Sequence, residues 1–172
     1  MKVCFIGHRT IQKTDELIQR MRETVKELIR KGVKIFLFGS VGAFNDLSWQ
    51  IVSELKKEYP FIQRVYVRAT YPHIEKFYEE YLLQSYEITY FPPQIEKAGR
   101  CAYVERNRVM IDESAYCIFY YDEEYLGQKR RRFINNTEYL ETSKSGTKIA
   151  YEYATKKKKQ IFNVYNAHLD KG

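Results

Sequence analysis

The chain has 172 residues, of which 44% are hydrophobic and 30% charged, a composition typical of one globular domain with a buried core. No apolar run approaches the ~20 residues of a membrane helix, and residues 3–6 are too few for a signal peptide, so we expect a cytoplasmic protein without a membrane partner. The net charge of +7 favours an anionic partner, whether phosphate, nucleotide, nucleic acid or acidic lipid.

Strand-like and helix-like patterns alternate along the chain. Apolar residues recur at helical spacing between Thr14, which fits an N-cap, and Gly32, which fits a helix end. Residues 33–38 are continuously apolar, as in a parallel strand covered on both faces. In chain order we expect strands at residues 2–6, 33–38, 62–69, 88–91, 116–120 and 161–165, and helices between Thr14 and Gly32, around 47–55, and at 72–83, 102–113 and 147–158.

This alternation predicts a single Rossmann-like α/β domain over residues 1–172, with three layers and a mainly parallel sheet. Residues 121–144 are polar and basic without a clear period, and we interpret them as an irregular insertion or mobile loop.

In such a sheet, ligands collect where the strands end. The first strand is followed by Gly7, His8 and Arg9. Glycine lets a ligand approach the backbone, and arginine offers a fork of donors suited to phosphate. The alternative is a tight turn with a surface arginine.

The second strand is followed by a turn that includes Gly39 and Ser40, and then by Asn45 and Asp46 at a helix start. This turn suits phosphate or ribose, although Asn45 or Asp46 also fits a helix cap. It is neither a P-loop nor a GxGxxG fingerprint, so we expect no dinucleotide cofactor. The cysteines lack metal-type spacing, so we expect no metal site.

Two further candidates lie on helices. Glu105, Arg106 and Asn107 adjoin on one helix, so only part of this group faces one pocket; solvated ion pairs are the alternative. Ser145-Gly146-Thr147 opens the last helix, where free N–H groups suit phosphate, although Ser145 also fits a simple N-cap.

Two basic runs account for much of the net charge. Residues 156–159 fall in the last turn of a helix, where cations are favoured for structural reasons. Residues 129–132 would suit a nucleic acid or a nucleotide, or lie in a solvated loop.

In this order, the motifs resemble the YpsA-like branch of the SLOG superfamily, which also includes cytokinin-activating phosphoribohydrolases and the DNA-processing protein A fold. The resemblance rests on residues 4–9, 45–46, 105–112 and 145–147 and covers nearly the whole chain. It implies a Rossmann-like fold, a nucleotide or nucleotide-derived ligand and often a homo-oligomer.

The phosphoribohydrolase motif fits only in part. Arg106 matches its arginine, but Ile149 and Ala150 stand where its catalytic glutamate belongs. Glu152 is nearest, yet helix geometry rotates it away. N-glycosidic cleavage needs a carboxylate near the ribose, which Glu105, Asp46 or Asp122 would have to supply.

We therefore expect a domain that binds or senses a nucleotide-type phosphate ligand. The alternatives are a nucleotide N-glycosidase of the phosphoribohydrolase type and a single-stranded nucleic-acid binder. The candidate ligand-binding residues are Gly7, His8, Arg9, Gly39, Ser40, Asn45, Asp46, Glu105, Arg106, Asn107, Asp122, Ser145, Gly146 and Thr147.

Overall fold

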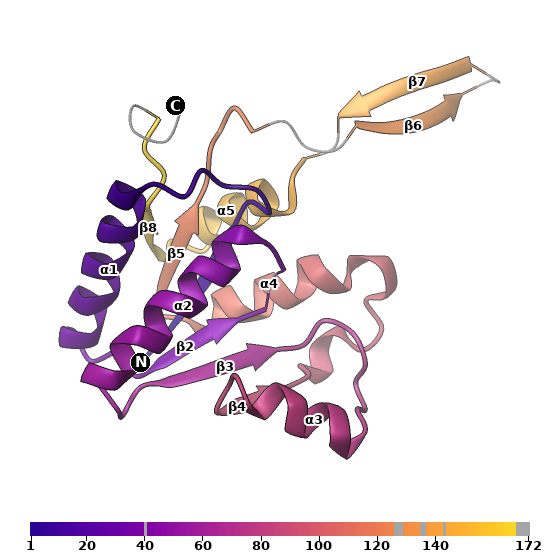
Figure 1. The fold of residues 1–172 in the computed structure, drawn as a ribbon. Helices are drawn as coiled ribbons and strands as arrows, with labels where there is room; N and C mark the ends of the chain where they lie inside the picture. Colours follow the sequence, from indigo (N-terminus) through magenta and orange to yellow (C-terminus); the bar gives the residue numbers. More distant parts are fainter. Residues whose placement is uncertain (40, 126–128, 135–136, 143, 168–172) are drawn as a thin grey trace.

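The main element of the structure is a six-stranded sheet in which every neighbouring pair of strands is parallel. The computed structural model describes residues 1–39, 41–125, 129–134, 137–142 and 144–167, so the candidate Ser40 lies outside the described residues. The strands of this sheet are β1 (Lys2–Gly7), β2 (Ile35–Phe38), β3 (Gln63–Val67), β4 (Ile88–Tyr90), β5 (Tyr116–Tyr120) and β8 (Gln160–Asn163). Their order is β4-β3-β2-β1-β5-β8 (Figure 1).

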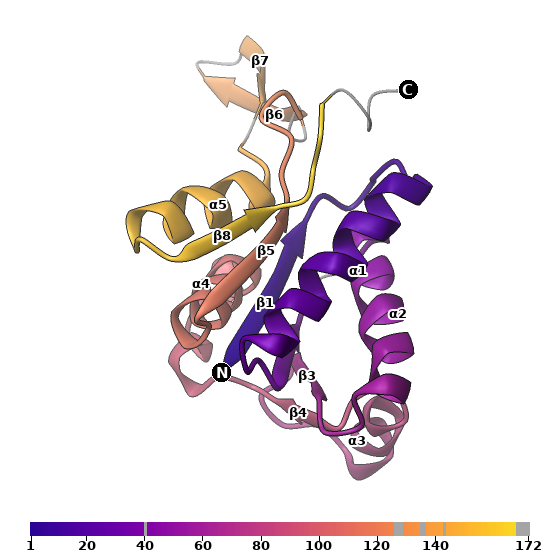
Figure 2. The same ribbon diagram turned by 90° about the vertical axis from the view of Figure 1, so that its left-hand side faces the viewer.

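Helices cover both faces of the sheet, as the alternating pattern predicts. They are α1 (Asp15–Arg30), α2 (Ala43–Glu58), α3 (Lys76–Leu83), α4 (Ala102–Glu113) and α5 (Gly146–Lys156), with the 3-10 turns η1 (Pro93–Ile95) and η2 (Gly99–Cys101). Figure 2 shows α1 and α2 on one face and α4 and α5 on the other. The predicted three-layer Rossmann-like fold is confirmed. Each described helix is too short or too polar to cross a lipid bilayer.

Two apolar clusters fill the space between the layers, and β1 contributes to both. Its side chains alternate, so Val3 and Phe5 pack under α1 and α2, whereas Cys4 and Ile6 pack under α4 and α5. All four are at most 2% exposed. Burial on both faces explains why the strand has a continuous apolar sequence.

The ends of α1 are as the sequence predicts. The Thr14 hydroxyl oxygen accepts a hydrogen bond from the Leu17 amide at 3.1 Å, which satisfies a free donor in the first turn. Gly32 follows the helix with φ of 92°, a left-handed conformation that glycine adopts without strain.

The predicted start of α3 at Pro72 is wrong, because the helix begins at Lys76. Tyr71 has a left-handed φ of 59°. The Arg68 guanidinium donates hydrogen bonds to the carbonyls of Tyr71 and Pro72. These carbonyls are therefore engaged by a side chain, and the helix starts one turn later.

The expectation that residues 121–144 are irregular is also wrong, whereas their interpretation as an insertion stays a prediction. This segment contains β6 (Lys129–Ile134) and β7 (Thr137–Thr142), which pair antiparallel from Lys129↔Thr142 to Ile134↔Thr137. They form a separate two-stranded sheet that projects away from the six-stranded sheet (Figure 1). Strands pair through main-chain hydrogen bonds, which any sequence can form. Strands are predicted from alternating apolar residues, and a polar hairpin lacks that pattern.

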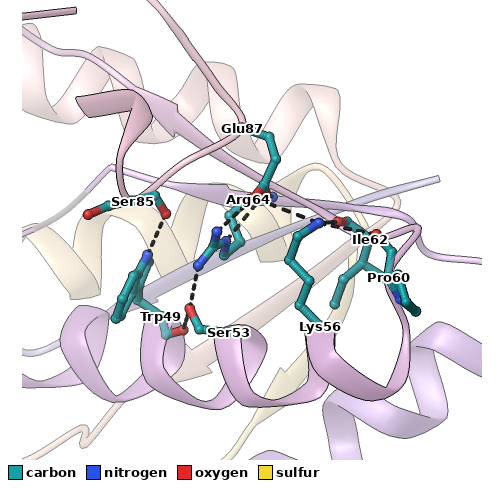
Figure 3. Close-up of polar contacts among 8 residues, drawn as sticks. All are labelled: Trp49, Ser53, Lys56, Pro60, Ile62, Arg64, Ser85 and Glu87. Atoms are coloured by element: carbon teal, nitrogen blue, oxygen red, sulfur yellow. Dashed lines mark hydrogen bonds and ion pairs between the residues drawn. The ribbon is translucent and has the colours of Figure 1, made fainter. Parts of the chain in front are cut away.

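A polar network joins α2 to β3 and to the segment before β4 (Figure 3). Arg64 donates from its main-chain amide and its guanidinium to Glu87 at 2.6 and 2.7 Å, and to the Ser53 hydroxyl at 2.8 Å. The Trp49 indole donates to the Ser85 carbonyl at 3.0 Å. These contacts fix the position of α2 against the β3–β4 side of the sheet.

Candidate functional site

The carboxyl edge of the sheet brings most of the candidate residues together. We use this term for the edge where β1, β2, β3 and β5 end at Gly7, Phe38, Val67 and Tyr120. Because each crossover helix runs antiparallel to the strands, α1, α2, α4 and α5 begin at this edge and direct free N–H groups toward it. The strand order reverses at β1, between β2 and β5, which is where ligands bind in open α/β sheets.

Arg106 is a buried cation at this edge. It is 2% exposed, and its Nη1 donates to the carbonyls of Gly39 and Val67, the latter at 3.1 Å. Its Nε donates to the side-chain oxygen of Asn107 at 3.1 Å. Burial lowers the pKa of Arg106 to about 10, so the guanidinium remains charged at neutral pH. Within the described part of the chain, no carboxylate forms an ion pair with it.

The two glycines at the strand ends make room for protein side chains. A Cβ on Gly39 would lie 2.7 Å from Cζ of Arg106, and a Cβ on Gly7 would lie 2.5 Å from Cγ of Phe44. The space beside Gly7 is therefore filled by Phe44. This differs from the expectation that Gly7 lets a ligand approach the backbone.

His8 is buried beside β5. It is 2% exposed, and its Nε2 accepts a hydrogen bond from the Asp122 amide at 3.1 Å. The proton of the neutral ring is therefore on Nδ1, which has no hydrogen-bond partner among the described residues. The Tyr125 ring stacks on His8 with centroids 3.9 Å apart. Burial lowers the pKa of His8, which favours the neutral form.

An open cavity lies at the point where the strand order reverses. Its volume is about 390 Å³, within the range of roughly 300–1,000 Å³ typical of small-molecule sites. The Asp122 side chain is at its wall and accepts a hydrogen bond from the Glu124 amide at 3.0 Å. The lining residues are His8, Thr10, Ile11, Gln12, Tyr120, Asp122, Tyr125 and Tyr165.

The structure separates the neighbours of Arg106 on α4. Arg106 and Asn107 are buried, whereas Glu105 forms an ion pair with Arg108 at 2.7 Å on the partly exposed side of the helix. Only part of this group is therefore buried, and whether that part faces a ligand stays a prediction. For Glu105, the simple interpretation as a solvated ion pair holds.

The start of α5 combines a cap with open space. The Ser145 hydroxyl oxygen accepts a hydrogen bond from the Lys148 amide at 3.1 Å, so Ser145 is an N-cap. A Cβ on Gly146 would meet nothing within 4 Å, and Thr147 is 6% exposed. A phosphate role for this turn stays a prediction.

Asn45 and Asp46 are not helix caps, so that alternative is wrong. The N-cap of α2 is Gly42, whose φ of 125° favours glycine. Asn45 and Asp46 instead line a second cavity, of about 420 Å³, between α2, β3 and α3. The main chain of Arg9 lies beside this helix start, since its carbonyl accepts from the Ala43 amide at 2.8 Å. The Arg9 residue itself is exposed.

Two residues at this edge, Arg68 and Tyr66, are not among the candidates predicted from the sequence. Arg68 directly follows β3, and its Nε is buried without a partner among the described residues; burial lowers the pKa of Arg68. Tyr66 is half-buried, and burial raises its pKa. The third strand was predicted to extend to residue 69, which placed Arg68 within the strand; its end at Val67 places Arg68 at the carboxyl edge. Among the described residues, no group of three His, Cys, Asp or Glu side chains is placed to hold a metal.

The parallel sheet, the reversal of strand order at β1 and the buried cation at the strand ends define a Rossmann-like α/β protein with a candidate anion site at the carboxyl edge. The sequence model of the YspA SLOG family matches residues 6–166. The chain therefore belongs to this family, and the predicted membership of the SLOG superfamily is confirmed. This membership indicates a nucleotide-related function. No curated protein matches the chain in sequence.

Proposed function

We propose that the chain binds a nucleotide or a nucleotide-derived ligand at the carboxyl edge, and that Arg106 supplies the positive charge for its phosphate. The observation that carries this proposal is a guanidinium that is 2% exposed and is bonded to uncharged oxygens at the ends of two strands.

The electrostatics of Arg106 support an anionic ligand. Removing a guanidinium from water costs several kcal/mol, and carbonyl dipoles offset this cost only in part. A phosphate at the strand ends would supply the counter-charge, and the planar donor fork of arginine suits phosphate oxygens. The N-termini of the surrounding helices favour the same charge.

The residues around α5 support binding rather than cleavage. Ala150 is 2% exposed and apolar, and Ile149 is also apolar, so neither position supplies a carboxylate. Glu152 is paired with Lys144 at 2.8 Å. A carboxylate near the ribose is what N-glycosidic cleavage needs, so the hydrolase alternative lacks its acid on this helix.

The test is calorimetric titration of the purified chain with nucleoside monophosphates, ADP-ribose, NAD and cyclic nucleotides, with adenosine as the phosphate-free control. At least one phosphate-bearing ligand should bind about tenfold more tightly than adenosine, which corresponds to about 1.4 kcal/mol. Arg106→Gln should remove most of this difference, and Arg106→Lys should restore part of it because the charge returns.

The matched control is Arg108→Gln on the same helix. Arg108 is paired with Glu105 at 2.7 Å, so this variant should bind within about twofold of the wild type. Equal affinity in the wild type and in Arg106→Gln would place the site elsewhere. If chromatography after incubation detects free base, the chain hydrolyses the N-glycosidic bond, and the proposal of binding alone is wrong.

A further inference from the structure

We propose that the cavity between α2, β3 and α3 is a subsite for a heteroaromatic ring that carries an amino group, so that the bound nucleotide has an amino-bearing base. This inference rests on the proposed function and specifies the class of ligand. The residues that line the cavity are Asn45, Asp46, Trp49, Tyr66, Tyr81, Leu82, Ser85 and Tyr86.

The shape and lining of the cavity suit a flat ring. Its volume is about 420 Å³, and it is walled by aromatic side chains from three elements and from the segment after α3. The rings of Tyr66 and Tyr86 lie 5.2 Å apart at 32°. Tyr81 is 59% exposed on α3, where its ring stacks on that of Tyr78 with centroids 6.2 Å apart. Aromatic side chains stack on the flat face of a base, and every base has such a face.

The polar groups of the cavity distinguish between rings. Asn45 is 8% exposed. Its side chain interacts with the Tyr86 hydroxyl, and its Oδ1 has no hydrogen-bond partner among the described residues. A buried amide oxygen without a partner is unfavourable and favours a ligand that donates an N–H group. The Trp49 N–H is already bonded to the Ser85 carbonyl. Burial raises the pKa of Tyr86 to about 12, so its hydroxyl stays neutral.

The cavity and Arg106 are both linked to the end of β3. Tyr66 and Val67 are consecutive residues at the end of β3. The Tyr66 ring packs against the apolar cluster under α1 and α2. On this face of the sheet it lines the cavity. The Val67 carbonyl accepts from Arg106 at 3.1 Å. A ring in the cavity and a phosphate near Arg106 would therefore contact the same strand end.

Trp49 supplies a direct readout, because it is the single tryptophan of the chain and lines the cavity. Adenosine 5′-monophosphate should change the tryptophan fluorescence, and ribose 5-phosphate should not. Inosine 5′-monophosphate, with a carbonyl in place of the amino group, should bind at least fivefold more weakly, because it offers an acceptor where Asn45 needs a donor.

Variants test the cavity itself. Tyr81→Ala should weaken binding of adenosine 5′-monophosphate at least fivefold, and Phe77→Ala, on the same helix but outside the cavity and 79% exposed, should bind within twofold of the wild type. Asn45→Leu should remove the preference for the adenine over the hypoxanthine ring. Circular dichroism checks that each variant is folded.

The outcomes separate the two proposals. Ribose 5-phosphate that binds as tightly as adenosine 5′-monophosphate, without a change in fluorescence, would overturn the ring subsite and leave the phosphate site standing. Adenosine that alters the fluorescence as strongly as its monophosphate would support the ring subsite and count against the phosphate site. No binding of any of these ligands would overturn both.

Discussion

At the scale of single residues, the carboxyl edge depends on a tight contact between Gly39 and Arg106. The guanidinium donates to the Gly39 carbonyl, and it fills the space that a side chain at residue 39 would occupy. Glycine is required here because of this close approach and not because of an unusual backbone angle. The position of the buried charge is therefore set by the absence of a side chain on the neighbouring strand end.

Gly39→Ala should destabilise the protein and weaken ligand binding together. The added methyl group would lie 2.7 Å from Cζ and 2.9 Å from Cδ of Arg106, and overpacking of this kind costs about 1–3 kcal/mol. Urea unfolding measures the cost, and titration with the best nucleotide measures the binding. Gly146→Ala is the control, because its new Cβ meets nothing within 4 Å, so its free energy of unfolding should be nearly unchanged. An equal loss of stability in both variants would contradict the packing argument.

His8 should make stability depend on pH. Its pKa in the folded chain is lowered by burial, so the unfolded chain takes up the proton first as the pH falls. Stability should therefore be full above the ordinary histidine pKa and fall as the pH drops toward the lowered value. Thermal unfolding between pH 8 and 5 measures this slope. His8→Gln, which keeps an acceptor for the Asp122 amide, should show a shallower slope; the same slope in both proteins would contradict the assignment.

At the scale of elements, the polar network of Figure 3 connects α2 to β3 and to the segment before β4. Burial opposes ionisation of Glu87, but hydrogen bonds and charge from Arg64, with the charge of Lys56, outweigh it and lower the Glu87 pKa. The network therefore stabilises the fold above the ordinary carboxyl pKa and loses this contribution as the pH falls through the lowered value.

Glu87→Gln should cost about 1–3 kcal/mol at pH 7, the usual range for hydrogen bonds to a charged group. The difference from the wild type should shrink as the pH falls from the ordinary glutamate pKa through the lowered value, because the wild-type carboxyl becomes protonated over that range. Denaturant unfolding at pH 7 and pH 3.5 measures both values. Glu23→Gln on the exposed surface of α1 is the control, with an expected change within about 0.5 kcal/mol. A difference that is independent of pH would contradict the role of the ion pair.

Elements with an apolar period could be predicted from the sequence, and polar ones could not. The residues of α1 that were expected to face the core are buried, apart from the partly buried Ile18, and β5 has the predicted bounds. The hairpin β6–β7 was missed because its pairing uses main-chain groups and no apolar stripe. The start of α3 was misplaced because a side chain from the preceding loop, Arg68, binds the turn.

At the scale of the whole molecule, the candidate site could be predicted in position but not in detail. The rule that ligands bind where parallel strands end located Gly7, Gly39 and the start of α5. It could not show that Arg106 is buried against Gly39 or that Asn45 faces a cavity. Those facts depend on contacts between residues far apart in the sequence, which local patterns do not encode.

The hairpin is a separate sheet, so the domain should fold and bind its ligand without it. Residues 129–142 contain four basic and two acidic side chains. Their ends, Lys129 and Thr142, are paired and therefore lie about 5 Å apart, so a short Gly-Ser linker can replace the segment. The shortened chain should unfold cooperatively, with Tm within about 4 °C of the wild type, and nucleotide affinity should be unchanged.

The same variant tests the nucleic-acid alternative. If the basic strand β6 binds single-stranded nucleic acid, the wild type should bind an oligonucleotide at low salt, with an affinity that falls steeply as salt is added, and the shortened chain should not. Fluorescence anisotropy with a labelled oligonucleotide measures both proteins. Loss of nucleotide binding in the shortened chain would instead contradict the placement of the site at the carboxyl edge alone, because the hairpin would then contribute to it.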